Sequence, residues 1–189
     1  MSARKFVQSA YLDSSAFIPL IDASNSLHNK IVNHLKETQL FPGIDTVVLS
    51  EVLAGVDGSV DRDELVEIYT RQFRVPSFDA QAAKVSAEIF RLLKSAGQIP
   101  RGKGMERQVT KADIMIVATA IVNSAAEFIY EDKHFKRYPE LLPEKICGFP
   151  LPKFTRASDL PDVLVQTEMA GLETSQSMIS QERNVSKVD

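Results

Sequence analysis

Four acidic residues stand where apolar segments of this chain end or begin. They are Asp13 after AYL, Glu51 in TVVLSEVLAG, Asp113 in TKADIMIVATAI and Asp132 in FIYEDKHF. Carboxylates in such positions can converge on one pocket, because the carboxyl ends of parallel strands meet at one edge of an α/β sheet. Two unit charges about 4 Å apart repel by roughly 4 kcal/mol near a protein surface. A cluster of four must therefore take up protons or bind a cation.

A hard divalent metal ion is the cation that suits these donors. Carboxylate oxygens without Cys thiolates or paired His favour Mg²⁺ or Mn²⁺ over zinc. Such an ion activates water and neutralises the charge that develops on phosphorus during hydrolysis of a phosphodiester. We therefore take the four acids as candidate catalytic residues and metal ligands, with Mg²⁺ or Mn²⁺ as the expected cofactor.

Each acid also has a simpler interpretation. Thr110 and Asp113 fit a capping box at the start of a helix. Asp13 fits an N-cap for the helix SSAFIPL. Asp132 in the turn EDKH and Glu51 on a helix could be solvated surface charges. The joint occurrence of the four acids in this order favours a site.

The periodicity of apolar residues predicts strands that alternate with helices, and hence an α/β fold with a mostly parallel sheet covered on both faces. The predicted strands cover residues 5–13, 44–47, 73–78, 127–130 and 145–149. The predicted helices cover residues 14–22, 26–38, 49–54, 79–95 and 134–142, with one more ending near Gln72 and one beginning at Thr110. The core face of this last helix is predicted to consist of Ile114, Val117, Ala118 and Ile121. Residues 98–108 are predicted to form a loop.

Length and composition allow one α/β domain with an appendage. The chain has 189 residues and 44% hydrophobic content, too few residues for two large domains. We expect a domain over residues 1–152 and a C-terminal extension over 153–189, partly helical or disordered, because Glu173–Asp189 is rich in Ser and Gln. The single cysteine, Cys147, is expected to be a buried thiol in a reducing compartment. No segment approaches the roughly 20 apolar residues of a membrane span, so we expect a soluble cytoplasmic protein.

The ordered set LDSSA, SEVLAG, KADIMIVATA and EDKHF resembles the PIN domain. This is a family of metal-dependent ribonucleases that includes the VapC-like toxins of bacterial and archaeal toxin–antitoxin pairs. The resemblance covers about residues 5–150 and implies a three-layer α/β/α fold around a central, mostly parallel sheet. It also implies that Ser15, two positions after the first Asp, supports the metal-binding and catalytic set formed by Asp13, Glu51, Asp113 and Asp132.

The function implied by this resemblance is that of a Mg²⁺- or Mn²⁺-dependent endoribonuclease that hydrolyses RNA phosphodiester bonds. The likeness to VapC-like members further implies the toxin of a toxin–antitoxin pair. The implied partners are a small antitoxin protein and a second copy of the chain. One alternative is a catalytically silent PIN-fold interaction module, favoured by Tyr130, where the family commonly has Thr or Ser. The other alternative is a haloacid-dehalogenase-like phosphatase. That family has a second Asp two residues after the first one, where this chain has Ser15.

Charge is distributed unevenly along the chain. The net charge is −3, and residues 157–189 carry six acids against two bases, a charge of −4, which leaves +1 on residues 1–156. The chain as a whole therefore lacks the basic signature of a non-specific nucleic-acid binder. Because an acidic pocket repels a polyanion, nearby cations are needed to attract phosphate. The candidate RNA-binding residues are Arg101, Lys103, Arg107 and Lys111. The alternative is that they form only a solvated surface loop.

Overall fold

A parallel sheet of four strands forms the centre of the fold. The structure is a computed structural model, and it describes residues 8–99 and 105–162, with the backbone alone over 105–109. The strands are β1 (Ser9–Leu12), β2 (Phe41–Gly43), β3 (Glu127–Tyr130) and β6 (Lys153–Arg156), in the order β2-β1-β3-β6. Each pairing in this sheet is parallel. The central strands β1 and β3 are buried along their whole length, as is usual for parallel strands covered on both faces.

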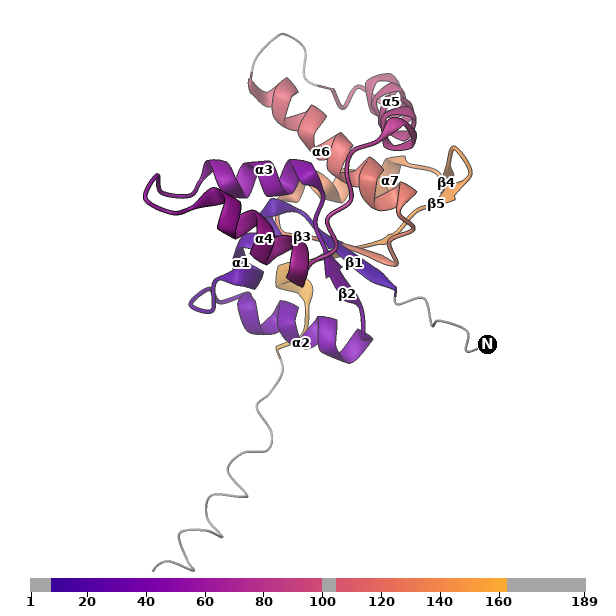
Figure 1. Cartoon of the computed structure of the whole chain (residues 1–189). Coiled ribbons are helices and arrows are strands. Elements are labelled where there is room, and N and C mark those ends of the chain that lie inside the picture. The colour runs from indigo at the N-terminus through magenta and orange to yellow at the C-terminus, as the bar shows by residue number, and fades with distance from the viewer. Residues whose placement is uncertain (1–7, 100–104, 163–189) are drawn as a thin grey trace, which may run out of the picture.

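Helices cover both faces of this sheet (Figure 1). They are α1 (Ser14–Ile21), α2 (His28–Thr38), α3 (Thr46–Ala54), α4 (Arg62–Gln72), α5 (Ala80–Ser95), α6 (Met105–Val122) and α7 (Arg137–Leu141), with the 3₁₀ turns η1 (Lys133–Lys136) and η2 (Ala157–Asp159). In Figure 1, α2 lies below the sheet and α6 above it. The predicted three-layer α/β/α fold is therefore confirmed.

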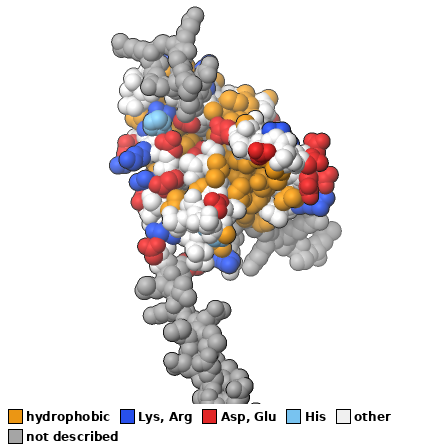
Figure 2. All heavy atoms as spheres, turned by 90° about the vertical axis from the view of Figure 1, so that its left-hand side faces the viewer, with side chains coloured by type: hydrophobic (Ala, Val, Ile, Leu, Met, Phe, Trp, Pro, Cys, Tyr) orange, Lys and Arg blue, Asp and Glu red, His pale blue; other side chains and the backbone are white. Residues whose placement is uncertain are grey.

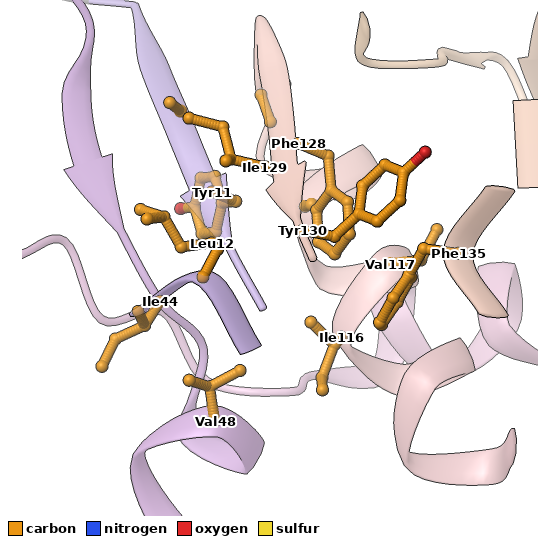
Figure 3. Close-up of a cluster of buried hydrophobic side chains, with 14 of the residues drawn as sticks. Tyr11, Leu12, Ile44, Val48, Ile116, Val117, Phe128, Ile129, Tyr130 and Phe135 are labelled. Carbon is orange, nitrogen blue, oxygen red and sulfur yellow. The ribbon is translucent and has the colours of Figure 1, made fainter. Parts of the chain in front are cut away.

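Helix α6 contributes one face to the core, which also includes buried residues of the sheet and of α1, α2, α3 and α5. The predicted core face of α6 is buried, and it consists of Ile114, Val117, Ala118 and Ile121. Spacings of three and four residues place these side chains on one side of the helix. Figure 3 shows Ile116 and Val117 of the same helix near the side chains of β1 and β3.

Within the described parts of the chain, none of the helices has the length and apolar character of a membrane span.

Two of the predicted strands are wrong. Residues 44–47 are not a strand, because β2 ends at Gly43 and α3 begins at Thr46. The side chain of Asp45 accepts a hydrogen bond from the Val48 N–H at 2.9 Å and caps this helix. Residues 73–78 contribute an isolated bridge between Arg74 and Gly43 in place of a strand. Pro76 lacks the N–H that a longer pairing needs.

The segments on either side of β3 also differ from their predictions. Helix α6 begins at Met105, within the predicted loop over residues 98–108. Residues 145–149 contain the start of an antiparallel hairpin, β4 (Lys145–Ile146) and β5 (Phe149–Pro150), in place of a single strand. Cys147 and Gly148 form its turn, with φ angles of 52° and 89°. This turn position exposes Cys147, so the predicted buried thiol is wrong.

Strand β6 lies within the segment predicted as a partly helical or disordered extension. A buried carboxylate, that of Glu127 on β3, holds this strand in the sheet. Glu127 accepts hydrogen bonds from Lys153 Nζ at 3.0 Å and from the Thr155 hydroxyl. His34 Nε2 of α2 lies 2.7 Å from the other oxygen of the same carboxylate. The division of the chain into a domain over 1–152 and an extension over 153–189 otherwise stays a prediction, and residues 163–189 lie outside the described residues.

Candidate active site

The first and last of the predicted acids lie at the same edge of the sheet. Asp13 directly follows β1, and Asp132 follows β3 after one intervening residue. The Asp13 N–H donates to the Ile129 carbonyl at 3.0 Å, which aligns the carboxyl ends of the two strands. Asp13 also caps α1, as its simpler interpretation predicts. A helix cap and a site residue are therefore compatible roles for the same side chain.

Ser15 connects these two strand ends. Its hydroxyl donates to Asp13 Oδ2 at 2.5 Å, and its backbone N–H donates to the same oxygen at 3.0 Å. The hydroxyl oxygen also accepts from the N–H groups of Glu131 and Asp132, at 2.9 and 3.0 Å. Burial raises the pKa of Asp13, and the hydrogen bonds from Ser15 partly offset this rise. Ser15 thus orients the Asp13 carboxylate and keeps it more acidic than burial alone would.

Asp113 reaches the same region from α6. Its carboxylate is buried, and Oδ2 makes no hydrogen bond, although Arg137 Nη2 lies 3.6 Å away. The pKa of Asp113 is raised to about 7, mainly by burial and next by the charge of Asp13, whereas Arg137 lowers it. Asp132 and Glu51 add further increases. The four predicted acids therefore repel one another through space, which is the condition that favours a bound cation.

Glu51 and Asp132 are the exposed members of this set. Glu51 lies on α3, and Asp132 caps η1 by accepting from the His134 N–H at 2.9 Å. Their side chains face solvent, while those of Asp13 and Asp113 are buried. The structure thus brings the acids together as a buried pair with two exposed neighbours.

The donor chemistry of this region fits a hard divalent cation. Its four acids provide carboxylate oxygens, and one of them, Asp113 Oδ2, is buried without a hydrogen bond. The spacing is not that of a closed coordination shell, because no three His, Cys, Asp or Glu side chains among the described residues are grouped closely enough to hold a metal ion. Asp13 and Asp113 are the residues that would hold such an ion, with Glu51 and Asp132 at its exposed side.

Arg137 is a residue of this region that the sequence reasoning missed. It begins α7, and its Nε and Nη2 are buried without hydrogen bonds. Its guanidinium also lies 5.4 Å from the centre of the Tyr138 ring, within the range of a cation–π contact. The repulsion among the predicted acids suggests that a cation lies close to them. The sequence does not show which one, because Arg137 is one of several cations in KHFKR.

Asp45 is a second missed acid. It is 1% exposed, and its pKa is raised to about 6, mainly by burial, with a smaller contribution from the charge of Glu51. Its capping bond to Val48 fixes the start of the helix that carries Glu51. The sequence reasoning placed Asp45 in a predicted strand over 44–47 and so did not consider it. An Asp just before an apolar run is, however, a known signal for the start of a helix.

Tyr130 packs in the aromatic part of the core. Its ring lies 5.6 Å from Phe135 and 6.5 Å from Phe128, in the cluster that Figure 3 shows. Near Asp13, the Ser15 hydroxyl accepts from the backbone N–H groups of residues 131 and 132.

The predicted RNA-binding cations are only partly described. Lys111 is exposed on α6, two residues before Asp113. Arg101 and Lys103 lie outside the described residues, and Arg107 lies in the part of α6 described by its backbone alone. Their role in binding RNA stays a prediction.

A four-stranded parallel sheet between helical layers, with acids gathered at the carboxyl ends of its strands, defines a class of α/β/α proteins with a ligand site at that edge. The family model of the PIN domain matches residues 10–141. The chain belongs to the PIN domain family, as the sequence resemblance implied. No curated protein sequence matches the chain.

Solved structures support the same fold. A structure of VapBC2 from Rickettsia felis bound to a promoter DNA fragment aligns with a TM-score of 0.54 and 16% identity, over 79% of this chain and 98% of that one. VapBC-1 from nontypeable Haemophilus influenzae gives a TM-score of 0.55 and 16% identity, over 80% and 100%. A toxin–antitoxin complex from Klebsiella pneumoniae gives 0.50 and 18%, over 73% and 99%. At these identities the likeness establishes the fold alone.

Proposed function

We propose that this protein is a Mg²⁺- or Mn²⁺-dependent endoribonuclease that hydrolyses RNA phosphodiester bonds. The observation that carries the proposal is the pair of buried carboxylates of Asp13 and Asp113, in which Asp113 Oδ2 accepts no hydrogen bond. Burial, and then the charge of Asp13, raise the pKa of Asp113 to about 7. A buried carboxylate that feels the charges of nearby acids is stabilised by a proton or by a cation. Membership of the PIN domain family supports the same reaction class.

The roles of the chain's own residues follow from their contacts. Asp13 is fixed by Ser15 and by the cap of α1, so it offers a preorganised carboxylate oxygen. Asp113 offers an oxygen with no other hydrogen bond. Arg137, whose Nη2 lies 3.6 Å from Asp113 Oδ2, stabilises the ionised form of Asp113. A bound Mg²⁺ or Mn²⁺ supplies an acidified water and neutralises the charge that develops at phosphorus.

Partners are a further part of the proposal. Solved structures that share the fold include a toxin–antitoxin complex from Klebsiella pneumoniae and DNA-bound VapBC2 from Rickettsia felis. We therefore propose a small antitoxin protein and a second copy of this chain as partners. The cations Arg101, Lys103, Arg107 and Lys111 are proposed to contact RNA, and a cytoplasmic location remains a prediction.

A catalytically silent PIN-fold interaction module is the second candidate. The observation that favours it is the absence, among the described residues, of a group of three possible ligands close enough to hold a metal. A silent module would keep the acids and show neither metal binding nor RNA cleavage. The two candidates therefore differ in a measurable property.

Cleavage of RNA by the purified full-length chain tests the proposal. We expect cleavage with Mn²⁺, none after addition of EDTA, and loss of cleavage in Asp13→Asn and Asp113→Asn with an unchanged circular dichroism spectrum. Asp63→Asn, at an exposed acid of α4, is the matched control and should cleave normally. Full cleavage by both site variants would exclude the assigned residues. Absence of cleavage and of Mn²⁺ binding by calorimetry in the wild type would favour the silent module.

A further inference from the structure

An apolar groove lies on the side of the molecule that carries α1, α2 and α4. It runs between α1, α2 and α4 and has a volume of about 600 Å³. We name it the α1–α2–α4 groove, and the side chains that define it are Leu20, Ile21, Val32, Leu65, Ile68 and Tyr69. Among the described residues that line it, Lys36 is the one charged side chain. Figure 2 shows hydrophobic side chains gathered on the side of the molecule where these helices lie.

The helices around this groove leave apolar surface uncovered. No residue of α4 is buried, although Leu65, Ile68 and Tyr69 face the groove. On α1, Ile18 is 48% exposed and Ile21 is 39% exposed. A helix whose apolar side is only half covered, beside a continuous apolar patch, is typical of a surface that another segment covers.

The described chain ends against α2, one of the helices that line this groove. Asp162, the last described residue, forms an ion pair of 3.0 Å with Lys30 of α2. Lys30 also donates to the carbonyls of Ser158 and Leu160, at 3.4 and 3.2 Å, so the chain end is attached to α2 at three points. Val32 of the same helix lines the groove. The sequence continues for 27 residues, from 163 to 189.

Length is no obstacle to reaching the groove. Helix α2 has 11 residues and is about 16 Å long. Ten residues of extended chain span up to about 33 Å. Ten extended residues after Asp162 are therefore long enough to pass around α2 and reach the groove. Residues 173–189 are not needed for this connection.

The sequence that follows Asp162 complements the groove in polarity. Residues 163–172 read VLVQTEMAGL, with one charge, Glu168. An apolar segment with one acid thus faces an apolar groove with one base, Lys36. Residues 173–189 are polar, as expected for a part that stays outside the groove.

We propose that residues 163–172 of the same chain bind in the α1–α2–α4 groove. Binding of this segment is intramolecular because it belongs to the same chain, and the contacts with Lys30 fix the point from which it starts. The effective concentration for a short connection is about millimolar. A segment of modest intrinsic affinity can therefore occupy the groove for most of the time. The proposal concerns a surface apart from the acids and does not depend on nuclease activity.

Disulfide trapping in the full-length chain tests this proposal. The native thiol is removed by Cys147→Ser, and Met169→Cys is combined with Gln72→Cys, an exposed position that lines the groove. The matched control combines Met169→Cys with Lys84→Cys, an exposed position on α5. Under mild oxidation we expect the groove pair to form an intramolecular disulfide about tenfold faster than the control pair, in keeping with its higher effective concentration. Mass spectrometry and gel mobility give the rates.

A second pair of variants separates apolar docking from random collision. Val165→Asp with Leu172→Asp should abolish the faster trapping, whereas Gln166→Asp with Thr167→Asp should leave it in place. Equal rates for the Gln72 and Lys84 pairs would overturn the proposal. A product that joins two chains and grows with protein concentration would assign the groove to a second copy, and reactive thiols without any groove product would assign it to another protein. Either result also overturns the proposal.

Discussion

The Ser15 hydroxyl donates to Asp13 Oδ2 at 2.5 Å while it accepts from two backbone N–H groups beyond β3. One side chain therefore sets both the orientation of an acid and the distance between two strand ends.

Ser15→Ala should lower the free energy of unfolding by about 1–3 kcal/mol, because two N–H groups and a carboxylate oxygen lose a partner. The pKa of Asp13 should rise further, since a hydrogen bond that lowers it is removed. Urea unfolding and carboxyl chemical shifts measure the two effects. Ser14→Ala, at the adjacent half-buried position, is the control and should change neither. A stable Ser15→Ala protein with an unchanged Asp13 titration would contradict this account.

Arg137→Gln should raise the pKa of Asp113 above about 7, because the guanidinium at 3.6 Å lowers that pKa in the native protein. Carboxyl chemical shifts followed against pH give the measurement. Arg71→Gln removes an exposed arginine that pairs with Glu67 on α4, and it should leave the Asp113 titration unchanged. An Asp113 pKa that stays the same or falls in Arg137→Gln would show that the ion pair has no electrostatic role.

Stability without divalent ions should fall as pH rises from about 4 to about 7. Burial, and then the nearby acids, raise the pKa of Asp113 from 3.8 to about 7, so the folded state holds a proton that the unfolded chain has lost. A folded state that binds more protons than the unfolded state is stabilised at the lower pH. Asp45, with its pKa raised to about 6 chiefly by burial, contributes in the same direction.

Thermal unfolding at a series of pH values, in EDTA, measures this dependence. Asp113→Asn should flatten it, because the amide does not titrate, and Asp63→Asn should not. A wild-type protein whose melting temperature rises steadily over the same interval would contradict the raised pKa values.

Mg²⁺ or Mn²⁺ should stabilise the folded protein above pH 7, where the acids are ionised and repel one another. A ligand at about 100 times its dissociation constant adds about 2.7 kcal/mol to the free energy of unfolding. Calorimetry and thermal unfolding give the affinity and the stabilisation. The effect should disappear in Asp13→Asn and persist in Asp63→Asn. A melting temperature that is insensitive to both ions would support the silent module.

Glu127→Ala should destabilise the protein by about 1–3 kcal/mol, because it leaves the Thr155 hydroxyl and His34 without their partner. The pKa of Glu127 is lowered although burial acts to raise it, because hydrogen bonds from Thr155, His34 and Lys153 outweigh burial. Urea unfolding measures the loss. Glu37→Ala, at an exposed acid of α2, should cost much less. RNA cleavage at a temperature where Glu127→Ala is folded should remain, since Glu127 lies at the opposite end of β3 from Asp132.

The parts of the fold that the sequence predicts well are those with local causes. The spacing of Ile114, Val117, Ala118 and Ile121 identifies the core face of α6 without knowledge of its neighbours. Asp13 and Asp132 could be placed at one sheet edge because each follows a buried strand, and parallel strands end together.

The parts that the sequence does not predict depend on contacts between distant segments. Strand β6 is short and only partly buried, and it is held by a carboxylate 26 residues earlier. His34 joins the same carboxylate from 93 residues away. Arg137 meets Asp113 only because α7 folds back toward α6. At Asp45 two local signals compete, and the helix cap prevails over the strand propensity of the Val-Val pair.

The bridge between Gly43 and Arg74 has a consequence for how this chain can assemble. Strand β2 stands at the edge of the sheet, where unpaired backbone groups usually invite a strand from another molecule. Here the Ile44 N–H donates to the Arg74 carbonyl at 2.9 Å, and the Arg74 N–H donates to the Pro42 carbonyl at 3.1 Å. The outward-facing bonding capacity at the end of β2 is thus already used. A strand from a second copy could pair with this end of β2 only by displacing Arg74.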